Sequence, residues 1–346
     1  MAQADIKSLS LDELTDEMAV LGLPKYRAEQ IFEWLHRKSV CTFDEMSNIS
    51  KTVREELSNL YYISVANIEK KQVSCYDETV KYLFKLNDGE YVEAVLMSYH
   101  HGYTICISTQ VGCKMGCTFC ATGKSGFSRN LAPSEMLAQI QAAQLDNSIR
   151  ISNVVLMGMG EPLDNYDNVI KFLSLVSSDK GLNIGMRHIT LSTCGVVPKI
   201  YELAKLKLQI TLAVSLHAPR DEIRSKTMPI NRRYNLERLI DACFVYSKAT
   251  GRRITFEYAM IDGVNDSDKC AYELARLLKG LMCHINLIPV NNVTGAGYKK
   301  SKKDRLNSFS KILESNGITA TVRRTLGSDI DASCGQLKRR LTEEKI

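Results

Sequence analysis

The sequence predicts an α/β fold built on a partial (β/α)6 TIM-type barrel. Three observations carry the prediction: short apolar runs alternate with helical runs from residue 103 onward, the alternation repeats about six times, and a cysteine cluster follows the first run. Strands that alternate with helices form parallel sheets with right-handed crossovers. The candidate strands are residues 103–109, 153–157, 188–192, 211–216, 254–260, 284–288 and 319–323, and the helical runs include 133–144, 236–248, 268–278 and 303–316. A flat, doubly wound sheet has the same periodicity, so it remains the alternative.

Residues 1–75 are predicted to form a small helical domain. Apolar residues recur at helical spacing in 11–21 and 26–38, Gly22-Leu23-Pro24 separates these two helices, and 53–60 is a third candidate. Small helical modules with exposed basic residues often bind nucleic acid, and as often they only cover a barrel. We therefore expect an RNA-binding accessory domain and keep the structural alternative beside it.

Residues 76–100 are predicted to form a β-hairpin extension, which leaves 101–346 for the barrel and a C-terminal loop. Alternating strands flank Asn87-Asp88-Gly89, a sequence typical of tight hairpin turns. Glu93 lies on the return strand among apolar neighbours. A strand glutamate is commonly exposed, but a buried one can serve as a general base.

The composition is that of a globular protein. The 346 residues are 45% hydrophobic, the formal net charge is +6, and no apolar run reaches the length of a transmembrane helix. The first residues lack the pattern of a signal peptide, so we expect a cytoplasmic protein. In that reducing compartment the eleven cysteines are explained as cluster ligands, catalytic thiols or buried apolar residues rather than as a disulfide scaffold.

Cys113, Cys117 and Cys120 form a C-x3-C-x2-C pattern in loop-like sequence. Thiolates bind soft metals and iron–sulfur clusters. A cubane cluster has four irons, so three cysteines leave one iron without a protein ligand and open to chemistry. One alternative is a zinc site completed by His100 or His101, although zinc sites usually contain C-x2-C pairs. The other is three buried cysteines without a metal.

Polar or glycine-rich segments follow four of the predicted strands. They are Gly158-Met159-Gly160-Glu161-Pro162, Ser192-Thr193-Cys194-Gly195, Ser215-Leu216-His217 and Ile288-Pro289-Val290-Asn291. The carboxyl ends of barrel strands carry the chemistry of this architecture. Each segment alone is explained by a turn, but four on one rim predict one shared ligand, with Glu161 accepting from its ammonium group.

Cys334 follows the last predicted strand in a polar loop, directly before Gly335. That context predicts a thiol that other molecules can reach, since reactive cysteines are partly exposed. A loop cysteine without a function is the simpler alternative.

Together these segments resemble the RlmN/Cfr family of radical S-adenosylmethionine (SAM) enzymes, which methylate adenine in ribosomal RNA. The resemblance covers essentially the whole chain. Its motifs are Cys113–Cys120 with Ala121-Thr122-Gly123, Gly158–Pro162, Ser215-Leu216-His217-Ala218-Pro219, Met228-Pro229-Ile230-Asn231, Gly263-Val264-Asn265-Asp266 and residues 329–337. Pro162 and residues 286–291 are similar to the RlmN branch, which methylates C2, rather than to the C8-methylating Cfr branch. Ser333 departs from the alanine usual before the cysteine, and we expect this small change to be tolerated.

The resemblance implies a barrel of the radical SAM type, with a [4Fe–4S] cluster on Cys113, Cys117 and Cys120 whose open iron binds SAM. It implies that Cys334 accepts a methyl group from one SAM, and that a 5′-deoxyadenosyl radical from a second SAM takes a hydrogen atom from that methyl group. The methylene radical then adds to C2, Cys106 resolves the adduct through a disulfide with Cys334, and Glu93 accepts the proton. The implied SAM-holding residues are Gly160, Glu161, Ser192, Ser215, Leu216, His217 and Asn291.

The implied substrates are an adenine at the peptidyl-transferase centre of 23S rRNA and the adenine beside the anticodon of some tRNAs. Such a base must be extruded to reach a pocket. Candidate phosphate contacts are Lys299, Lys300, Lys302, Lys303, Arg305, Lys338, Arg339 and Arg340, although a charge run is usually a solvated face.

We also expect an external one-electron reductant of the flavodoxin type and a monomer. The rivals are a radical SAM enzyme of another reaction type, such as a glycyl-radical activase, and a zinc-stabilised RNA-binding module without catalysis.

Overall fold

The chain is described by a computed structural model that covers residues 3–291, 297–333 and 335–337. Its centre is a mixed ten-stranded sheet in the order β14-β13-β12-β11-β10-β9-β6-β5-β4-β3. The parallel part consists of β6 (Gly102–Cys106), β9 (Ile151–Leu156), β10 (Ile189–Thr193), β11 (Thr211–Ser215), β12 (Ile254–Met260), β13 (Cys283–Pro289) and β14 (Ala320–Val322). Each predicted barrel strand is therefore confirmed, with ends that differ by a few residues.

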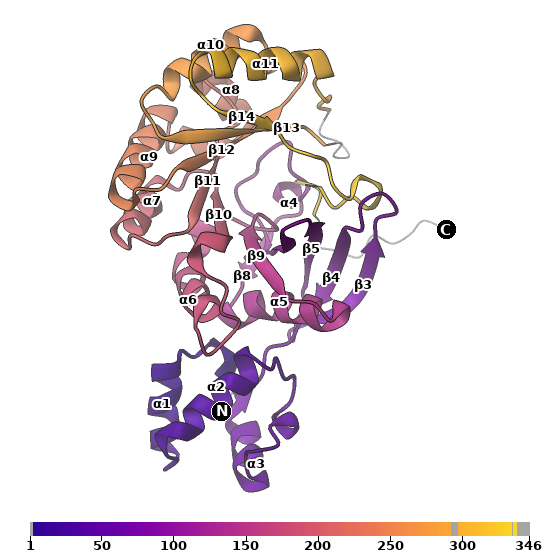
Figure 1. Cartoon of the computed structure of the whole chain (residues 1–346), viewed down its shortest axis with the longest axis vertical. Coiled ribbons are helices and arrows are strands. Elements are labelled where there is room, and N and C mark those ends of the chain that lie inside the picture. The colour runs from indigo at the N-terminus through magenta and orange to yellow at the C-terminus, as the bar shows by residue number, and fades with distance from the viewer. Residues whose placement is uncertain (1–2, 292–296, 334, 338–346) are drawn as a thin grey trace.

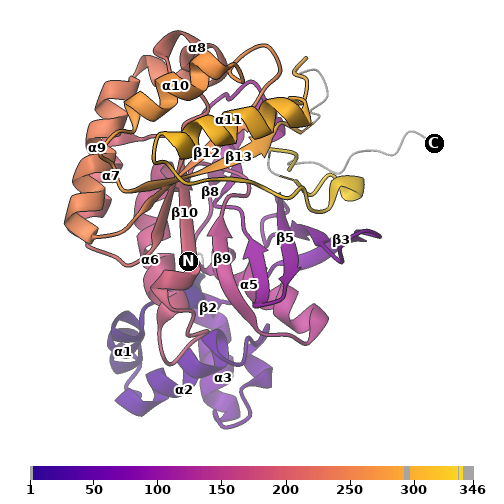
Figure 2. The same cartoon turned by 45° about the horizontal axis from the view of Figure 1, so that its top comes forward.

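The sheet curves without closing, because β14 and β3 are its two edges among the described residues. Helices lie along its outer side, and neighbouring helices pack on one another, as α7 does on α9 and α10 on α11 (Figures 1 and 2). This arrangement confirms the partial barrel over the flat alternative, since a doubly wound sheet carries helices on both faces. The outer helices are α5 (Pro133–Asn147), α6 (Tyr166–Ser177), α7 (Val197–Lys205), α8 (Asp221–Thr227), α9 (Leu236–Thr250), α10 (Asp268–Leu277) and α11 (Lys303–Ser315).

Local sequence signals fix the ends of these helices. The Asn235 side chain accepts from the N–H of Arg238 and so caps the start of α9, which ends at Gly251 with a φ of 66°. Ser267 caps α10 in the same way through the N–H of Cys270. Buried apolar side chains of the strands and of these helices form the core between the two layers.

The antiparallel part of the sheet contains β3 (Asn67–Val73), β4 (Val80–Lys85) and β5 (Tyr91–Tyr99). The predicted turn joins β4 to β5, and its Gly89 has a φ of 86°, which favours glycine. Strand β3 was not predicted, because it is polar and lies exposed at the sheet edge. The sheet therefore begins with β3, before residue 76. The hairpin extension was expected to start only at residue 76.

The predicted N-terminal helices are α1 (Leu11–Val20), α2 (Lys25–His36) and α3 (Lys51–Leu60). Helices α1 and α2 pack on each other, and the buried Leu14, Phe32 and Leu57 belong to the same continuous apolar core as the barrel. The amide of Gln141 on α5 donates to the carbonyl of Leu35 at 2.8 Å, so α2 is tied to the barrel.

The remaining elements are short. They are β1 (Ala4–Asp5), β2 (Tyr61–Tyr62), β7 (Gln110–Gly112), β8 (Phe127–Asn130), α4 (Ala121–Lys124) and the 3-10 helices η1 (Ile6–Ser8), η2 (Phe43–Glu45), η3 (Pro162–Asn165), η4 (Met186–His188), η5 (Pro229–Arg232) and η6 (Ser328–Ile330). Within the described ranges, no helix has both the length and the apolar character needed to cross a bilayer.

Candidate functional site

The carboxyl ends of the parallel strands surround one cavity, which we call the cluster cavity. Its lining brings together most of the site residues predicted from the sequence. They are Cys113, Cys117, Cys120, Gly160, Glu161, Ser192, Ser215, His217 and Asn291. The prediction that four strand ends face one shared ligand is therefore consistent with the geometry.

The three cysteines lie on a loop between β7 and β8, and these two strands pair with each other. The N–H of Cys113 donates to the carbonyl of Gly126 at 2.8 Å, which closes the base of the loop. Gly112 has a φ of 79°, and a Cβ there would lie 1.9 Å from the oxygen of Gly126. Only glycine fits this position, so the loop geometry depends on it.

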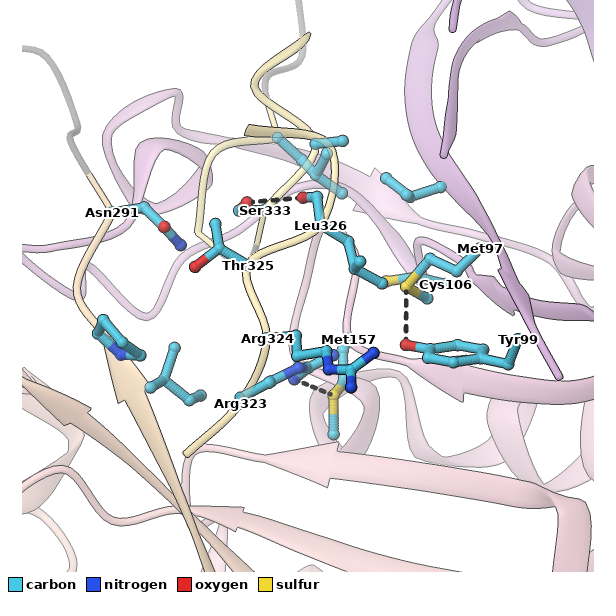
Figure 3. A pocket seen from close by; sticks show the side chains of 15 residues that line it. Met97, Tyr99, Cys106, Met157, Asn291, Arg323, Arg324, Thr325, Leu326 and Ser333 are labelled. Atoms are coloured by element: carbon cyan, nitrogen blue, oxygen red, sulfur yellow. Dashed lines mark hydrogen bonds between the residues drawn. The ribbon is translucent and has the colours of Figure 1, made fainter. Parts of the chain in front are cut away.

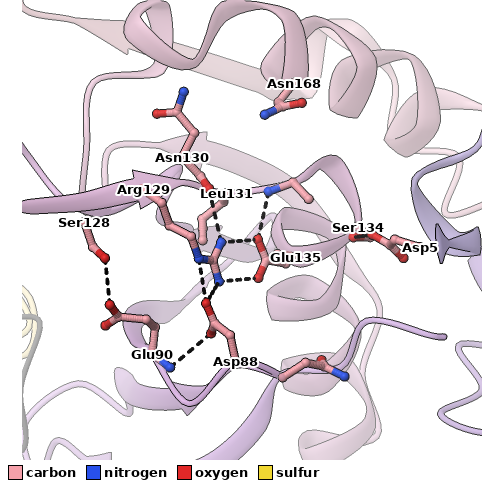
Figure 4. A network of polar contacts seen from close by, with 12 residues as sticks. Asp5, Asp88, Glu90, Ser128, Arg129, Asn130, Leu131, Ser134, Glu135 and Asn168 are labelled. Atoms are coloured by element: carbon pink, nitrogen blue, oxygen red, sulfur yellow. Dashed lines mark hydrogen bonds and ion pairs between the residues drawn. The ribbon is translucent and has the colours of Figure 1, made fainter. Parts of the chain in front are cut away.

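A second set of contacts anchors strand β8 from the outside (Figure 4). Arg129 donates to both carboxylate oxygens of Glu135 on α5 at 2.8 Å and to Asp88 in the β4–β5 turn at 2.7 Å. A guanidinium that forms paired bonds to a carboxylate fixes orientation as well as distance. The cysteine loop is thereby tied to the hairpin and to the helix that follows it.

The three thiols are brought together as candidate metal ligands. Every described cysteine is free of a disulfide, and Cys113, Cys117 and Cys120 all line the same cavity. The described residues contain no three His, Cys, Asp or Glu side chains close enough together to hold one ion, whereas a four-iron cluster spans more space. His100 and His101 lie at the β5–β6 turn, at the opposite end of β6 from the loop, which removes the proposed fourth ligand of a zinc site.

The glycine-rich segment after β9 is shaped by close backbone approach. A Cβ on Gly158 would lie 2.6 Å from the oxygen of Ile107, and one on Gly160 would lie 2.6 Å from the side chain of Gln110. Glu161 is 3% exposed and accepts from the N–H groups of Cys194 at 2.7 Å and Leu163 at 3.0 Å. Burial raises the pKa of Glu161, and these two N–H groups oppose the shift. A buried carboxylate held this way is prepared to receive a cationic group from the cavity.

His217 faces the cavity as a neutral ring. Its Nδ1 accepts from the N–H of Ala259 at 2.9 Å, and burial lowers its pKa to about 3. The neutral ring therefore carries its proton on Nε2 and can donate from there. Asn265, from one of the family motifs, holds the His217 carbonyl through a 2.7 Å hydrogen bond.

Leu216 differs from the other expected SAM-holding residues because its side chain is fully buried and does not line the cavity. Its N–H donates to the carbonyl of Glu257, and its own carbonyl accepts from Arg224. Any contact of Leu216 with a cavity ligand would thus use its backbone.

A second cavity adjoins the first, and we call it the Cys106 cavity. Figure 3 shows Met97, Cys106 and Tyr99 along one side of it and Asn291 on the opposite side. The two cavities share lining residues, namely Met157, Ile288, Asn291 and Arg323. Cys106 is 8% exposed and lines this cavity.

Cys334 lies outside the described residues, but both of its neighbours are placed. Ser333 lines the Cys106 cavity and Gly335 lines the cluster cavity. Ala121 directly follows Cys120, and its N–H donates to the carbonyl of Gly335 at 2.8 Å. The described parts of the C-terminal loop, residues 326–333 and 335–337, therefore contribute to the linings of both cavities.

Glu93 is 7% exposed, so the structure excludes the first of the two alternatives, an exposed strand glutamate, and leaves the buried one. Its carboxylate lies 3.3 Å from the ammonium of Lys81 on β4. Glu93 itself is not part of either lining, although Val95, two residues further along β5, lines the Cys106 cavity.

Sequence reasoning missed two charged groups of the site. Arg224 is fully buried and donates to the carbonyls of Cys194, Ser215 and Leu216, which ties two strand ends together. Glu257 lines the cluster cavity, its Oε1 accepts from Asn286 at 3.0 Å, and its Oε2 has no hydrogen-bond partner among the described residues. A lone carboxylate in the apolar strand 254–260 was the available signal for Glu257, whereas nothing in the sequence distinguishes Arg224 from a surface arginine.

The basic stretch before α11 is only partly available for RNA. Lys299, Lys300, Lys302 and Lys303 are exposed. Arg305 instead donates to Asp268 at 2.8 Å and to the carbonyl of Asp266. Lys338, Arg339 and Arg340 lie outside the described residues.

Comparisons with known proteins agree with this geometry. Residues 4–63 match the family described as the ribosomal RNA large subunit methyltransferase N-terminal domain, and residues 107–275 match the radical SAM superfamily. The chain is 55% identical over 335 residues to the probable dual-specificity RNA methyltransferase RlmN of Clostridium novyi, with 97% of this chain and 98% of that protein covered. It is likewise 55% identical over 340 residues to the protein of the same description from Alkaliphilus oremlandii, with 98% and 99% covered.

A solved structure gives the same result in three dimensions. The crystal structure of a radical SAM methyltransferase from Sphaerobacter thermophilus superposes with a TM-score of 0.93 at 46% identity, and the match covers 96% of this chain and 99% of that one. The fold expected from the sequence is thus confirmed over almost the whole chain.

Proposed function

Because the chain belongs to the RlmN family of radical SAM RNA methyltransferases, we propose that it methylates C2 of adenine in 23S rRNA and in tRNA. The observation that carries the proposal is the junction of the two cavities. The C-terminal loop contributes to a cavity lined by three cysteines and to a cavity lined by Cys106. The relatives named RlmN favour C2 over the C8 position of the Cfr branch.

The cofactors of this family are a [4Fe–4S] cluster and SAM. In our proposal Cys113, Cys117 and Cys120 hold the cluster, since all three thiols line one cavity. When the cluster and SAM are bound there, they supply a one-electron cleavage of SAM, and the product of that cleavage can remove a hydrogen atom from an otherwise unreactive carbon.

The polar groups of the cluster cavity would orient SAM. Glu161 would accept from its ammonium group, because its carboxylate is buried and already held by two backbone N–H groups. Gly160 gives the ligand close access to the backbone, and Ser192, Ser215, His217 and Asn291 offer side-chain hydrogen bonds. Leu216 would take part through its backbone alone.

Cys334, Cys106 and Glu93 would carry the methyl transfer. Cys334 would bear the methyl-derived carbon that bonds to C2, and Glu93 would accept the C2 proton while the electron pair of the C–H bond stays in the ring. The one unpaired electron left by the addition would pass to the one-electron carrier that serves SAM cleavage. The Cys106 thiolate would then form a bond to the Cys334 sulfur as the sulfur–carbon bond to the product breaks, and the product carbon would keep that electron pair and take up a proton to become the methyl group. The flanks of Cys334 support this proposal, since Ser333 shares the cavity of Cys106.

RNA would reach the junction after the target base leaves its stack. The helical domain, residues 1–75, and the exposed Lys299, Lys300, Lys302 and Lys303 are the proposed contacts. We also propose that the protein is a cytoplasmic monomer and that it receives electrons from a flavodoxin-type protein.

Mass spectrometry of nucleosides tests the function directly. The reconstituted protein is incubated without oxygen with SAM, a reductant and either a 23S rRNA fragment or a tRNA transcript. We expect 2-methyladenosine in the RNA and none with the Cys113→Ala variant. A product that is mainly 8-methyladenosine would place the protein in the other branch, and no methyladenosine in either RNA would refute the proposal.

A further inference from the structure

Lys81 occupies a position that neither the sequence motifs nor the proposed chemistry explains. It is 7% exposed on strand β4, and charged side chains are rarely so buried without a partner. Lys81 lies opposite Val95 on β5, and Val95 lies opposite Cys106 on β6. Directly opposed residues share a face of the sheet, so these three side chains form one row on the face of the Cys106 cavity.

The Lys81 ammonium joins two parts of the site. It lies 3.3 Å from the Glu93 carboxylate, which belongs to the neighbouring strand, and it donates to the carbonyl of Asp331 at 3.3 Å. Asp331 is in the C-terminal loop, and its side chain accepts from Gln336 at 3.0 Å. One cation therefore contacts both the carboxylate and the backbone of the loop.

Other contacts dock the same loop against the segment between β3 and β4. The Asp329 carboxylate accepts from the hydroxyl of Ser74 at 2.7 Å and from the N–H of Cys75 at 2.9 Å, and Asp77 accepts from the N–H of Gly327 at 2.9 Å. In this set Cys75 and Asp329 are exposed, whereas Ser74 and Lys81 are buried, and Lys81 lies beside Glu93.

We propose that Lys81 is a positioning residue that holds the Glu93 carboxylate at a fixed position relative to the C-terminal loop. The inference rests on the proposed function, in which Glu93 accepts the C2 proton of an adduct carried by that loop. A proton acceptor must lie within hydrogen-bond reach of the proton it removes. Lys81 supplies this alignment because it bonds to the acceptor and to the loop backbone at once.

The test compares Lys81→Met, Lys81→Arg and the control Lys85→Met, a change at an exposed residue of the same strand. We expect K81M to keep its iron and its SAM cleavage, while methyladenosine formation falls ~100-fold, the loss that a misplaced catalytic group can cause. The block should come after addition to the base, so a covalent RNA–protein adduct should accumulate. K81R should recover part of the rate, and K85M should match the wild type.

A double-mutant cycle with Glu93→Gln distinguishes alignment from a purely structural role. If Lys81 acts through Glu93, K81M/E93Q should form product at the rate of E93Q, because the group being aligned is already lost. The double variant also removes both buried charges together, so it stays informative if K81M alone folds poorly.

The outcomes separate the inference from the function on which it rests. Wild type that makes no methyladenosine refutes the proposed function. With active wild type, K81M within about threefold of the wild-type rate, or losses from K81M and E93Q that multiply in the double variant, would overturn the role of Lys81.

Discussion

The two adjoining cavities are built in different ways. Short segments that follow successive strands line the cluster cavity, and its three cysteines come from one loop of eight residues, Cys113–Cys120. The Cys106 cavity is partly lined by the C-terminal loop, and that loop is held by contacts between residues about 250 positions apart, such as Asp329 with Ser74 and Asp331 with Lys81. The cluster cavity therefore depends on local motifs, whereas the Cys106 cavity depends on how distant segments dock.

The largest effect is expected at the cluster loop. Changing Cys113, Cys117 or Cys120 to Ala removes one of three thiolates, and we expect the loss of bound iron and of all reductive SAM cleavage. Iron analysis and quantification of 5′-deoxyadenosine provide the measurement. Cys41→Ala, at an exposed cysteine of the N-terminal domain, is the control and should retain both. A cluster-loop variant that still cleaved SAM would refute the assignment.

A smaller effect in the same cavity is expected from Glu161→Gln. This change keeps the shape of the side chain but removes the charge that would face the SAM ammonium, and a charge-assisted hydrogen bond contributes about 1.5–3 kcal/mol. SAM should bind ~10- to 100-fold more weakly by equilibrium binding to the cluster-loaded protein. Glu202→Gln, which alters an ion pair with Lys199 on α7, should bind SAM normally. Equal affinity in the two variants would contradict the role of Glu161.

The two cavities also differ in how much of each could be predicted from the sequence. The barrel strands and the cluster cavity could be predicted, because alternation, C-x3-C-x2-C and the polar strand ends are local patterns. The burial of Glu93 could not, since its buried ion pair is with Lys81 on the neighbouring strand, and Lys81 in turn contacts the C-terminal loop. Arg224 was missed for a related reason: besides the side chain of Asn231, its partners are backbone carbonyls of two strand ends, and carbonyl partners leave no mark in the sequence.

The smallest predicted effect concerns the scaffold rather than either cavity. His36 on α2 is buried with both ring nitrogens unpaired among the described residues, and burial lowers its pKa to about 3. Below the ordinary histidine pKa of about 6.5 the unfolded chain binds a proton that the folded protein excludes, so stability is lost as pH falls. Between pH 7 and 5 this histidine should cost about 2 kcal/mol.

Denaturant unfolding of the wild type and His36→Phe at both pH values checks that expectation. The apolar ring removes the titration and leaves no hydrogen bond unmade, since the histidine makes none that the described residues provide. The variant should lose less stability on acidification by about 2 kcal/mol. Equal losses in both proteins would show that His36 does not titrate as described.

The most direct test of the junction between the cavities is the fate of RNA on Cys106→Ala. Cys106 shares its cavity with Ser333, directly before Cys334, and a disulfide requires the two Cα atoms within roughly 7 Å. Cytosolic disulfides are usually transient and catalytic. The variant should keep its cluster and stop with RNA bonded through a methylene carbon to Cys334, an adduct that survives denaturant and is located by peptide mass spectrometry. Cys334→Ala should form no adduct. Normal turnover by Cys106→Ala, or an adduct formed without Cys334, would contradict the account.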